Sequence, residues 1–226
     1  MKKEMRAPII AVFGSGQLID QAISIGREVA RANAILLTGG SGVEDGTVKG
    51  AAINGAEAEG GRWIGVLRHV CNDGFPGPSA KRKNFGLILE PRLGHRRNYL
   101  EACLCDVAIA LKGGKGTISE VVACASLEKP VVLVGWDDAI IRNLDWLIAD
   151  KYCPRIDALE ERITQLNPAV FDSEVVVRVS AETSPDGIVK KALQLAGAGR
   201  TGAFPAFLGD VYLPLSDAFE AYTDGQ

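Results

Sequence analysis

Histidine and cysteine are scarce in this chain of 226 residues, which has two histidines and five cysteines. Two histidines, His69 and His95, are too few for a histidine-rich metal site. The odd number of cysteines and their irregular spacing argue against the disulfide framework of a small secreted protein. Cys103 and Cys105 have no second Cys or His pair at zinc spacing, so we predict buried thiols and no metal site.

Long apolar segments and an excess of one charge are also absent. No apolar run reaches the ~18 residues that a membrane helix needs. The short charged segment that precedes the first apolar run contains no hydrophobic signal sequence. The net charge of -3 gives no electrostatic footprint for nucleic acid or an anionic membrane. We therefore expect a cytoplasmic protein that binds neither nucleic acid nor membranes.

Short apolar runs alternate with helical patterns along most of the chain. Because these runs are continuously apolar, they predict strands that are covered on both faces. The alternation predicts an α/β protein with a Rossmann-like, doubly wound parallel sheet and helices on both faces. The expected strands are 9–13, 34–37, 63–67, 86–89, 107–111, 130–134 and 174–179. The expected helices are 18–31, 43–59, 93–105, 116–127, 139–149 and 185–196.

Two segments depart from this alternation. Residues 69–85 are rich in turn formers and end in Lys81-Arg82-Lys83, so they form either a solvated loop or a basic flap over an anionic ligand. Residues 1–196 are predicted to form a single domain. The tail 197–226 contains Gly, Pro and scattered aromatic residues, and it packs either on this domain or on a neighbouring subunit.

Glycine clusters follow three of the predicted strands. The first, Gly14-Ser15-Gly16, lacks the third glycine of the dinucleotide fingerprint. No acidic residue ends the second strand, where a carboxylate would bind a ribose, so a classical NAD site is disfavoured. The second cluster begins at Gly39-Gly40. Turns of this kind lie at the carboxyl edge of a parallel sheet, where such folds bind ligands.

The third cluster is the most informative. Gly113-Gly114-Lys115-Gly116-Thr117 joins an apolar strand to a helix. Glycines let the backbone approach an anion, and the N–H groups and dipole at a helix start favour a phosphate. The chain is therefore predicted to bind a phosphorylated, nucleotide-like molecule. The predicted ligand-binding residues are Gly14, Ser15, Gly16, Gly39, Gly40, Gly113, Gly114, Lys115, Gly116 and Thr117.

Two charged positions near this cluster are candidate catalytic residues. Glu120 lies one turn into the helix, where it either reaches a sugar or water beside the phosphate or only stabilises the helix dipole. The preceding helix opens with His95-Arg96-Arg97. One arginine should face solvent and the other the crevice, where guanidinium suits phosphate. A solvated basic turn is the alternative.

The spacing of Arg97-Asn98, the strand that starts at Asp106-Val107, the glycine cluster and Glu120 resembles the signature of the LOG family. That family is named after the "Lonely guy" cytokinin-activating enzymes and was long mislabelled as lysine decarboxylases. The resemblance implies a Rossmann-like fold, a homodimer or larger homo-oligomer, and hydrolysis of a nucleoside 5′-monophosphate to base and ribose 5-phosphate. It implies that Arg97 and Glu120 are the catalytic pair and that no cofactor is required.

Three positions depart from the family pattern. Lys112 replaces a proline, Ser119 the first of two glutamates, and Asn98 a lysine. The broader superfamily also includes molybdenum cofactor carrier proteins, which bind a pterin phosphate without hydrolysis. The departures resemble that branch, so a carrier or sensor of a nucleotide or a molybdopterin-type ligand is the alternative. A decarboxylase would need a Schiff-base lysine, for which Lys115 is poorly placed, and a purely structural module is a further alternative.

Overall fold

The computed structural model of the chain describes residues 6–40, 46–68, 79–137, 175–198, 204 and 213–224. Its strands are β1 (Ile9–Phe13), β2 (Ile35–Thr38), β3 (Trp63–Val66), β4 (Ser79–Lys83), β5 (Gly86–Glu90), β6 (Val107–Leu111), β7 (Val131–Val134) and β8 (Val176–Val179). Its helices are α1 (Ile19–Arg31), α2 (Val48–Ala58), α3 (Arg97–Leu104), α4 (Lys115–Ser126), α8 (Pro185–Ala198) and α10 (Leu213–Thr223), and the 3₁₀ turn η1 (Gly94–Arg96) leads into α3.

The strands form one sheet in the order β4-β5-β3-β2-β1-β6-β7-β8. All neighbouring pairs are parallel except β4 and β5, which are antiparallel. Chain order reverses at β1, which pairs with β2 on one side and β6 on the other. Ligands of doubly wound sheets bind outside the carboxyl ends of the strands at such a reversal. The structure confirms the predicted α/β class and its Rossmann-like arrangement.

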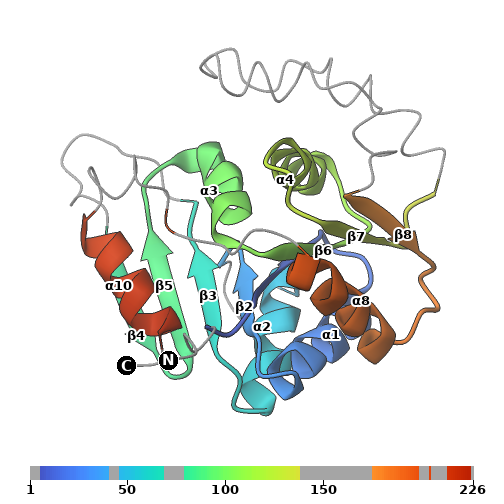
Figure 1. Cartoon of the computed structure of the whole chain (residues 1–226), viewed down its shortest axis with the longest axis horizontal. Helices are drawn as coiled ribbons and strands as arrows, with labels where there is room; N and C mark the ends of the chain where they lie inside the picture. The colour runs from blue at the N-terminus through green and yellow to red at the C-terminus, as the bar shows by residue number, and fades with distance from the viewer. Residues whose placement is uncertain are drawn as a thin grey trace.

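Helices cover both faces of the sheet (Figure 1). Because successive side chains of a strand point to opposite faces, Ile9, Ala11 and Phe13 enter the core beneath α3, α4 and α10. Ile10 and Val12 enter the core beneath α1, α2 and α8. Every residue of β1 and β6 is buried, which accounts for the continuous apolar runs in the sequence.

Helices α1 and α2 approach each other unusually closely. A side-chain carbon on Gly26 or Gly55 would lie under 3.0 Å from a backbone oxygen of the opposite helix. Only glycine permits this approach at both positions. The close contact fixes α2 against the sheet near the end of β1, and so it fixes the position of Lys49, the second residue of α2.

Two segments differ from the sequence-based expectations. Residues 79–83 form β4, an edge strand paired with β5, where a loop was expected. Their expected role as a loop or flap is therefore wrong for this part, and residues 69–78 lie outside the described residues. Part of the tail forms α10, which packs against β4 and β5 (Figure 1) and contributes Leu215, Phe219 and Tyr222 to the core. The expected helix 139–149 also lies outside the described residues.

The described cysteines, Cys103, Cys105 and Cys124, are all unpaired thiols. Cys105 is buried as expected, whereas Cys103, for which burial was also expected, is only partly buried; Cys124 is buried as well. Within the ranges given above, no helix is long and apolar enough to cross a bilayer. No group of three or more His, Cys, Asp and Glu side chains suited to a metal ion occurs among those same residues.

Candidate functional site

A cavity of about 230 Å³ opens where β1 and β6 end, at the reversal of the sheet. Segments from five described parts of the chain contribute to its wall: the turn after β1, α2, Arg68 after β3, α3 and the start of α4. The lining residues are Gly14, Ser15, Lys49, Arg68, Arg97, Asn98, Gly114, Gly116, Thr117 and Glu120.

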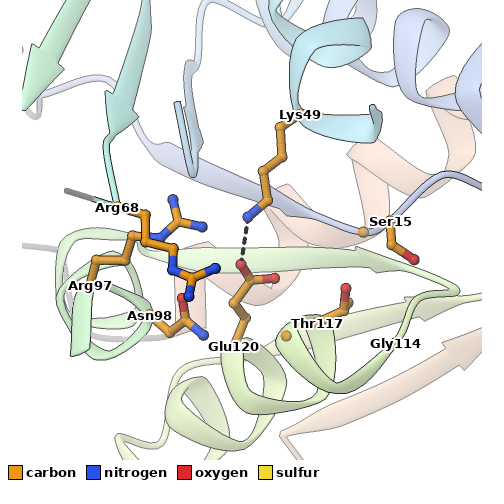
Figure 2. Close-up of a pocket in the computed structure, with 10 residues that line it drawn as sticks. Ser15, Lys49, Arg68, Arg97, Asn98, Gly114, Thr117 and Glu120 are labelled. Carbon is orange, nitrogen blue, oxygen red and sulfur yellow. Dashed lines mark hydrogen bonds and ion pairs between the residues drawn. The ribbon is translucent and has the colours of Figure 1, made fainter. Parts of the chain in front are cut away.

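The first turn of α4 forms one end of the cavity (Figure 2). Gly114 is the N-cap residue and supplies no side-chain cap, so the first N–H groups of the helix have no partner within it. A side-chain carbon on Gly114 or Gly116 would meet no atom within 4 Å among the described residues, apart from its chain neighbours and the helix's own backbone. Thr117 is nearly fully buried at the base of this turn. The backbone donors, the open space above them and the helix dipole are features that favour an anion at this turn.

Gly113 has a different environment from its neighbours. A side-chain carbon here would lie under 3.0 Å from Thr117 Oγ1 and 3.2 Å from Ser15 N. The backbone of Gly113 is therefore packed between the turn after β1 and the start of α4. Gly113 brings these two elements together and does not itself line the cavity.

Cationic side chains gather at the other end of the cavity. Figure 2 shows Arg68, Arg97 and Asn98 on the side opposite Ser15 and Thr117, with Lys49 reaching in from α2. Arg68 is exposed, while Arg97 and Asn98 are buried. Three cations around one small cavity make an environment that favours an anionic ligand.

Glu120 lies between the two ends (Figure 2). Its side chain is 2% exposed, and Oε1 accepts a hydrogen bond from Lys49 Nζ at 2.9 Å. Oε2 is buried and has no hydrogen-bond partner in the described part of the chain. A buried carboxylate oxygen without a donor is rare, because its desolvation costs free energy that a hydrogen bond normally offsets. This oxygen is available for a ligand or a water molecule.

Arg97 is held by the backbone at the ends of β2 and β3. Its Nη1 donates to the carbonyl oxygens of Gly39 and Val66, the latter at 2.7 Å. Nη1 also lies 3.2 Å from Glu101 Oε1, one turn further along α3. These contacts fix the guanidinium in place, so the side chain is pre-organised before any ligand arrives.

Gly39 makes room for this arrangement. A side-chain carbon at Gly39 would lie under 3.0 Å from both Arg97 Nη1 and Lys49 Nζ. Gly40 has a positive φ of 62° and packs against the backbone of Gly65. The glycines after β2 therefore shape the wall behind the cations, and neither of them lines the cavity.

Glu101 lies behind Arg97 and is completely buried. Burial raises the pKa of this carboxyl from 4.5 to about 7, because desolvation outweighs the attraction of Arg97 and Lys49, and Glu120 raises it further. Neither carboxyl oxygen has a hydrogen-bond partner in the residues that the structure describes.

The structure brings most of the predicted site residues together. The predicted residues that line the cavity are Gly14, Ser15, Arg97, Gly114, Gly116, Thr117 and Glu120. Gly39, Gly40 and Gly113 lie just behind its wall, and Gly16 does not line it. The predicted contact of the Lys115 side chain lies outside what the structure describes. Arg96 is exposed and Arg97 buried, which confirms the expectation that one of the two arginines faces solvent.

Lys49, Arg68, Asn98 and Glu101 were not among the predicted site residues. Lys49 and Arg68 stand in segments with no recognisable motif, and they reach the site only through the packing of α2 and the end of β3. Glu101 could have been noticed as an acid four residues after Arg97, a spacing that places the two on one face of a helix. Asn98 donates to Ser119 Oγ at 3.3 Å and so links α3 to α4.

Comparison with known proteins gives one family and several relatives. The sequence profile of the SLOG cluster4 family matches residues 7–151. An uncharacterised protein of Archaeoglobus fulgidus is 30% identical over 146 residues, which are 58% of this chain and 87% of that protein. The probable cytokinin riboside 5′-monophosphate phosphoribohydrolase LOGL9 of Oryza sativa is 34% identical over 145 residues, 60% of each chain. The match thus spans three fifths of the rice protein.

Solved structures with the same fold include two proteins that handle the molybdenum cofactor. The molybdenum cofactor binding protein of Rippkaea orientalis is 26% identical with a TM-score of 0.58, over 84% of this chain and 98% of that one. The molybdenum cofactor carrier protein of Chlamydomonas reinhardtii is 25% identical with a TM-score of 0.58, over 85% and 99%. These likenesses extend over nearly the whole of both known chains.

Proposed function

This chain belongs to the SLOG cluster4 family, and we propose that it binds a phosphorylated, nucleotide-like small molecule in the cytoplasm. The phosphate binds at the first turn of α4, where Gly114 and Gly116 leave open space and the helix N–H groups point into it. The observation that carries the proposal is the meeting of this turn with Lys49, Arg68 and Arg97 in one cavity. No metal or other cofactor is needed for this binding.

When the ligand is a nucleoside 5′-monophosphate, Glu120 is the residue placed to cleave it. In this reaction the oxygen of water forms a bond to C1′ of the ribose, and the bond from C1′ to the base nitrogen breaks. Glu120 accepts a proton from the water through Oε2, and a proton passes to the departing base. Positive charge develops on the sugar in the transition state, and the buried carboxylate stabilises it. Arg97 orients the ligand from the opposite wall.

A second candidate function is carriage of a phosphorylated ligand without hydrolysis. Two observations favour it. Ser119 stands where the hydrolases of the LOG family carry the first of two glutamates, and it is engaged with Asn98. The similarity to the two proteins that bind the molybdenum cofactor covers 98% and 99% of those chains. The cargo in this case is a pterin phosphate, held at the same turn of α4.

Base release from a panel of nucleoside monophosphates separates these functions. The purified chain is incubated with AMP and the other common monophosphates, and free base is measured by liquid chromatography. Hydrolysis predicts base release that Glu120→Gln lowers by roughly 10²–10⁴-fold. Glu220→Gln, an exposed glutamate on α10, is the matched control and should leave the rate unchanged.

Binding without chemistry predicts a different result. No base appears with any monophosphate, and native mass spectrometry of freshly purified protein finds a phosphorylated ligand bound to it. If no base is released, no ligand co-purifies and AMP, inorganic phosphate and sulfate all fail to bind, then the proposed function is wrong in both forms.

We also propose that the chain is a homodimer or larger homo-oligomer, as the resemblance to the LOG family implies. Light scattering coupled to gel filtration measures the molar mass directly. A mass of 24.0 kDa, that of one chain, would refute this proposal.

A further inference from the structure

Glu101 is a buried acid that neither candidate function uses. It lies in the middle of α3, its side chain is 0% exposed, and it does not line the cavity. It contacts a residue that does line the cavity, Arg97, whose Nη1 lies 3.2 Å from Glu101 Oε1. Both oxygens of Glu101 lack a hydrogen-bond partner among the described residues. A carboxylate in such a place is costly to keep ionised, because Arg97 is the one cation that contacts it directly among the described residues.

The charges around Glu101 come from three helices. Arg97 lies on the same helix, Lys49 reaches in from α2, and Glu120 lies on α4. Cys124, also on α4, is a fully buried thiol close enough to feel the charge of Glu101. Lys49 is already paired with Glu120 at 2.9 Å. The carboxyl groups of Glu101 and Glu120 therefore lie in one buried cluster with the two cations Arg97 and Lys49. An anion that binds to these cations adds a negative charge close to both carboxyl groups.

We propose that Glu101 couples anion binding in this cavity to the uptake of one proton. Above about pH 7 and with the cavity empty, the carboxylate is mainly ionised and Arg97 balances its charge. When an anion binds against Arg97 and Lys49, its negative charge offsets the attraction of these cations for the Glu101 carboxylate. Glu101 then accepts a proton from solvent. This inference rests on the proposed function, since it requires an anionic ligand at the site, but it assigns a role that binding alone does not need.

The direction of the coupling follows from electrostatics. An added negative charge disfavours a nearby buried carboxylate, so it raises the pKa of Glu101 above the value of about 7 that burial already produces. A ligand that causes proton uptake binds more tightly at lower pH. The affinity should therefore fall as pH rises above about 7, by up to roughly tenfold for each pH unit, which is the limit for one proton. Glu101 is a positioning residue, because it acts through Arg97 and does not contact the ligand.

Calorimetry of the full chain tests this coupling. AMP, inorganic phosphate and sulfate are each titrated into the protein just above pH 7, in two buffers that differ in ionisation enthalpy. The difference between the two heats gives the number of protons taken up. We expect up to about half a proton more for the wild-type chain than for Glu101→Gln, because at a pH near its pKa of about 7 half of the Glu101 carboxyl is already protonated before binding. Protonation of the ligand itself is the same for both proteins. Glu90→Gln, a buried glutamate on β5 away from the cavity, should behave as wild type.

A measurement on the wild-type chain alone guards against a variant that fails to fold. Infrared difference spectra with and without AMP should show the band of a protonated carboxyl growing on binding. Binding with the same proton uptake in wild type and Glu101→Gln, or with no such band, would overturn the coupling and leave the proposed function standing. If none of the three probes binds at all, the proposed function fails and the coupling fails with it.

Discussion

Gly39, which follows β2, and Gly116, in the first turn of α4, both lie near the cavity, but a methyl group added to each would meet different surroundings. At Gly39 it would lie under 3.0 Å from Arg97 Nη1 and Lys49 Nζ, whereas at Gly116 it would meet no atom within 4 Å. The glycine after β2 leaves space for the protein's own cations. The glycine in α4 borders open space, which in the proposed function a ligand occupies. Substitutions at the two positions should therefore separate damage to the fold from damage to binding.

Gly39→Ala should have the largest effect on stability. The new methyl group overpacks a buried site, which costs about 1–3 kcal/mol, and it displaces a guanidinium whose buried hydrogen bonds are worth about 1.5–3 kcal/mol. We expect the free energy of unfolding to fall by about 3 to 4 kcal/mol in urea denaturation. Gly197→Ala, at a position on α8 with no atom within 4 Å, is the matched control. A loss of less than about 1 kcal/mol at Gly39 would remove the contrast between the two positions.

Glu101→Gln should show how the buried acid next to Arg97 makes the free energy of unfolding depend on pH. The pKa of Glu101 is raised from 4.5 to about 7 by burial, so between these values the folded chain holds a proton that the unfolded chain has lost. Wild-type stability therefore falls as pH rises through this window. Above it, Glu101→Gln should be more stable than wild type by up to about 3 kcal/mol, and below it the two should match. Urea denaturation across the window checks this, and parallel curves for the two proteins would contradict it.

A double-mutant cycle tests whether Gly39 matters because of Arg97. In a chain that already carries Arg97→Met, the guanidinium that the methyl group of Gly39→Ala would displace is gone. The loss for the double variant should therefore be smaller than the sum of the two single losses by about 2 kcal/mol. Additive losses would mean that the crowding at Gly39 comes from Lys49 or the backbone, and the proposed reason for this glycine would need revision.

The sequence predicted those elements whose surroundings show in consecutive residues. These are the buried strands β1 and β6, which are continuously apolar, and the glycine turn that starts α4. The sequence did not predict β4, because Lys81 and its neighbours form a strand only through their pairing with β5. A strand at the edge of a sheet can carry charge that a central strand cannot.

The candidate site likewise contains residues that a local spacing predicts and residues that only the packing of distant segments brings in. Glu120 and Arg97 stand at fixed distances from the glycine turn, so a spacing identifies them. The partner of Glu120 is Lys49, 71 residues away along the chain, and it arrives there because Gly26 and Gly55 let α1 and α2 pack closely. No local pattern reports such a contact. Gly39 and Gly116 look alike in the sequence, because a glycine indicates only that a side chain is not accommodated there. The structure shows that Arg97 and Lys49 occupy the space at Gly39, whereas the space at Gly116 is open.

Gly116→Ala should have the smallest effect on stability and a clear effect on binding. Alanine favours a helix over glycine by up to about 1 kcal/mol, and the new methyl group meets no protein atom within 4 Å, so the free energy of unfolding should stay level or rise slightly. The same methyl group enters the space proposed for the phosphate, and we expect the affinity for AMP to fall by roughly tenfold, or about 1.4 kcal/mol. Gly197→Ala makes the same change on α8, outside the cavity, and should leave AMP binding unaltered. The affinities of the two variants for AMP are measured by calorimetry at one pH. Equal affinities would mean that the phosphate does not bind at the start of α4, because the added methyl group of Gly116→Ala would then occupy no part of the binding site.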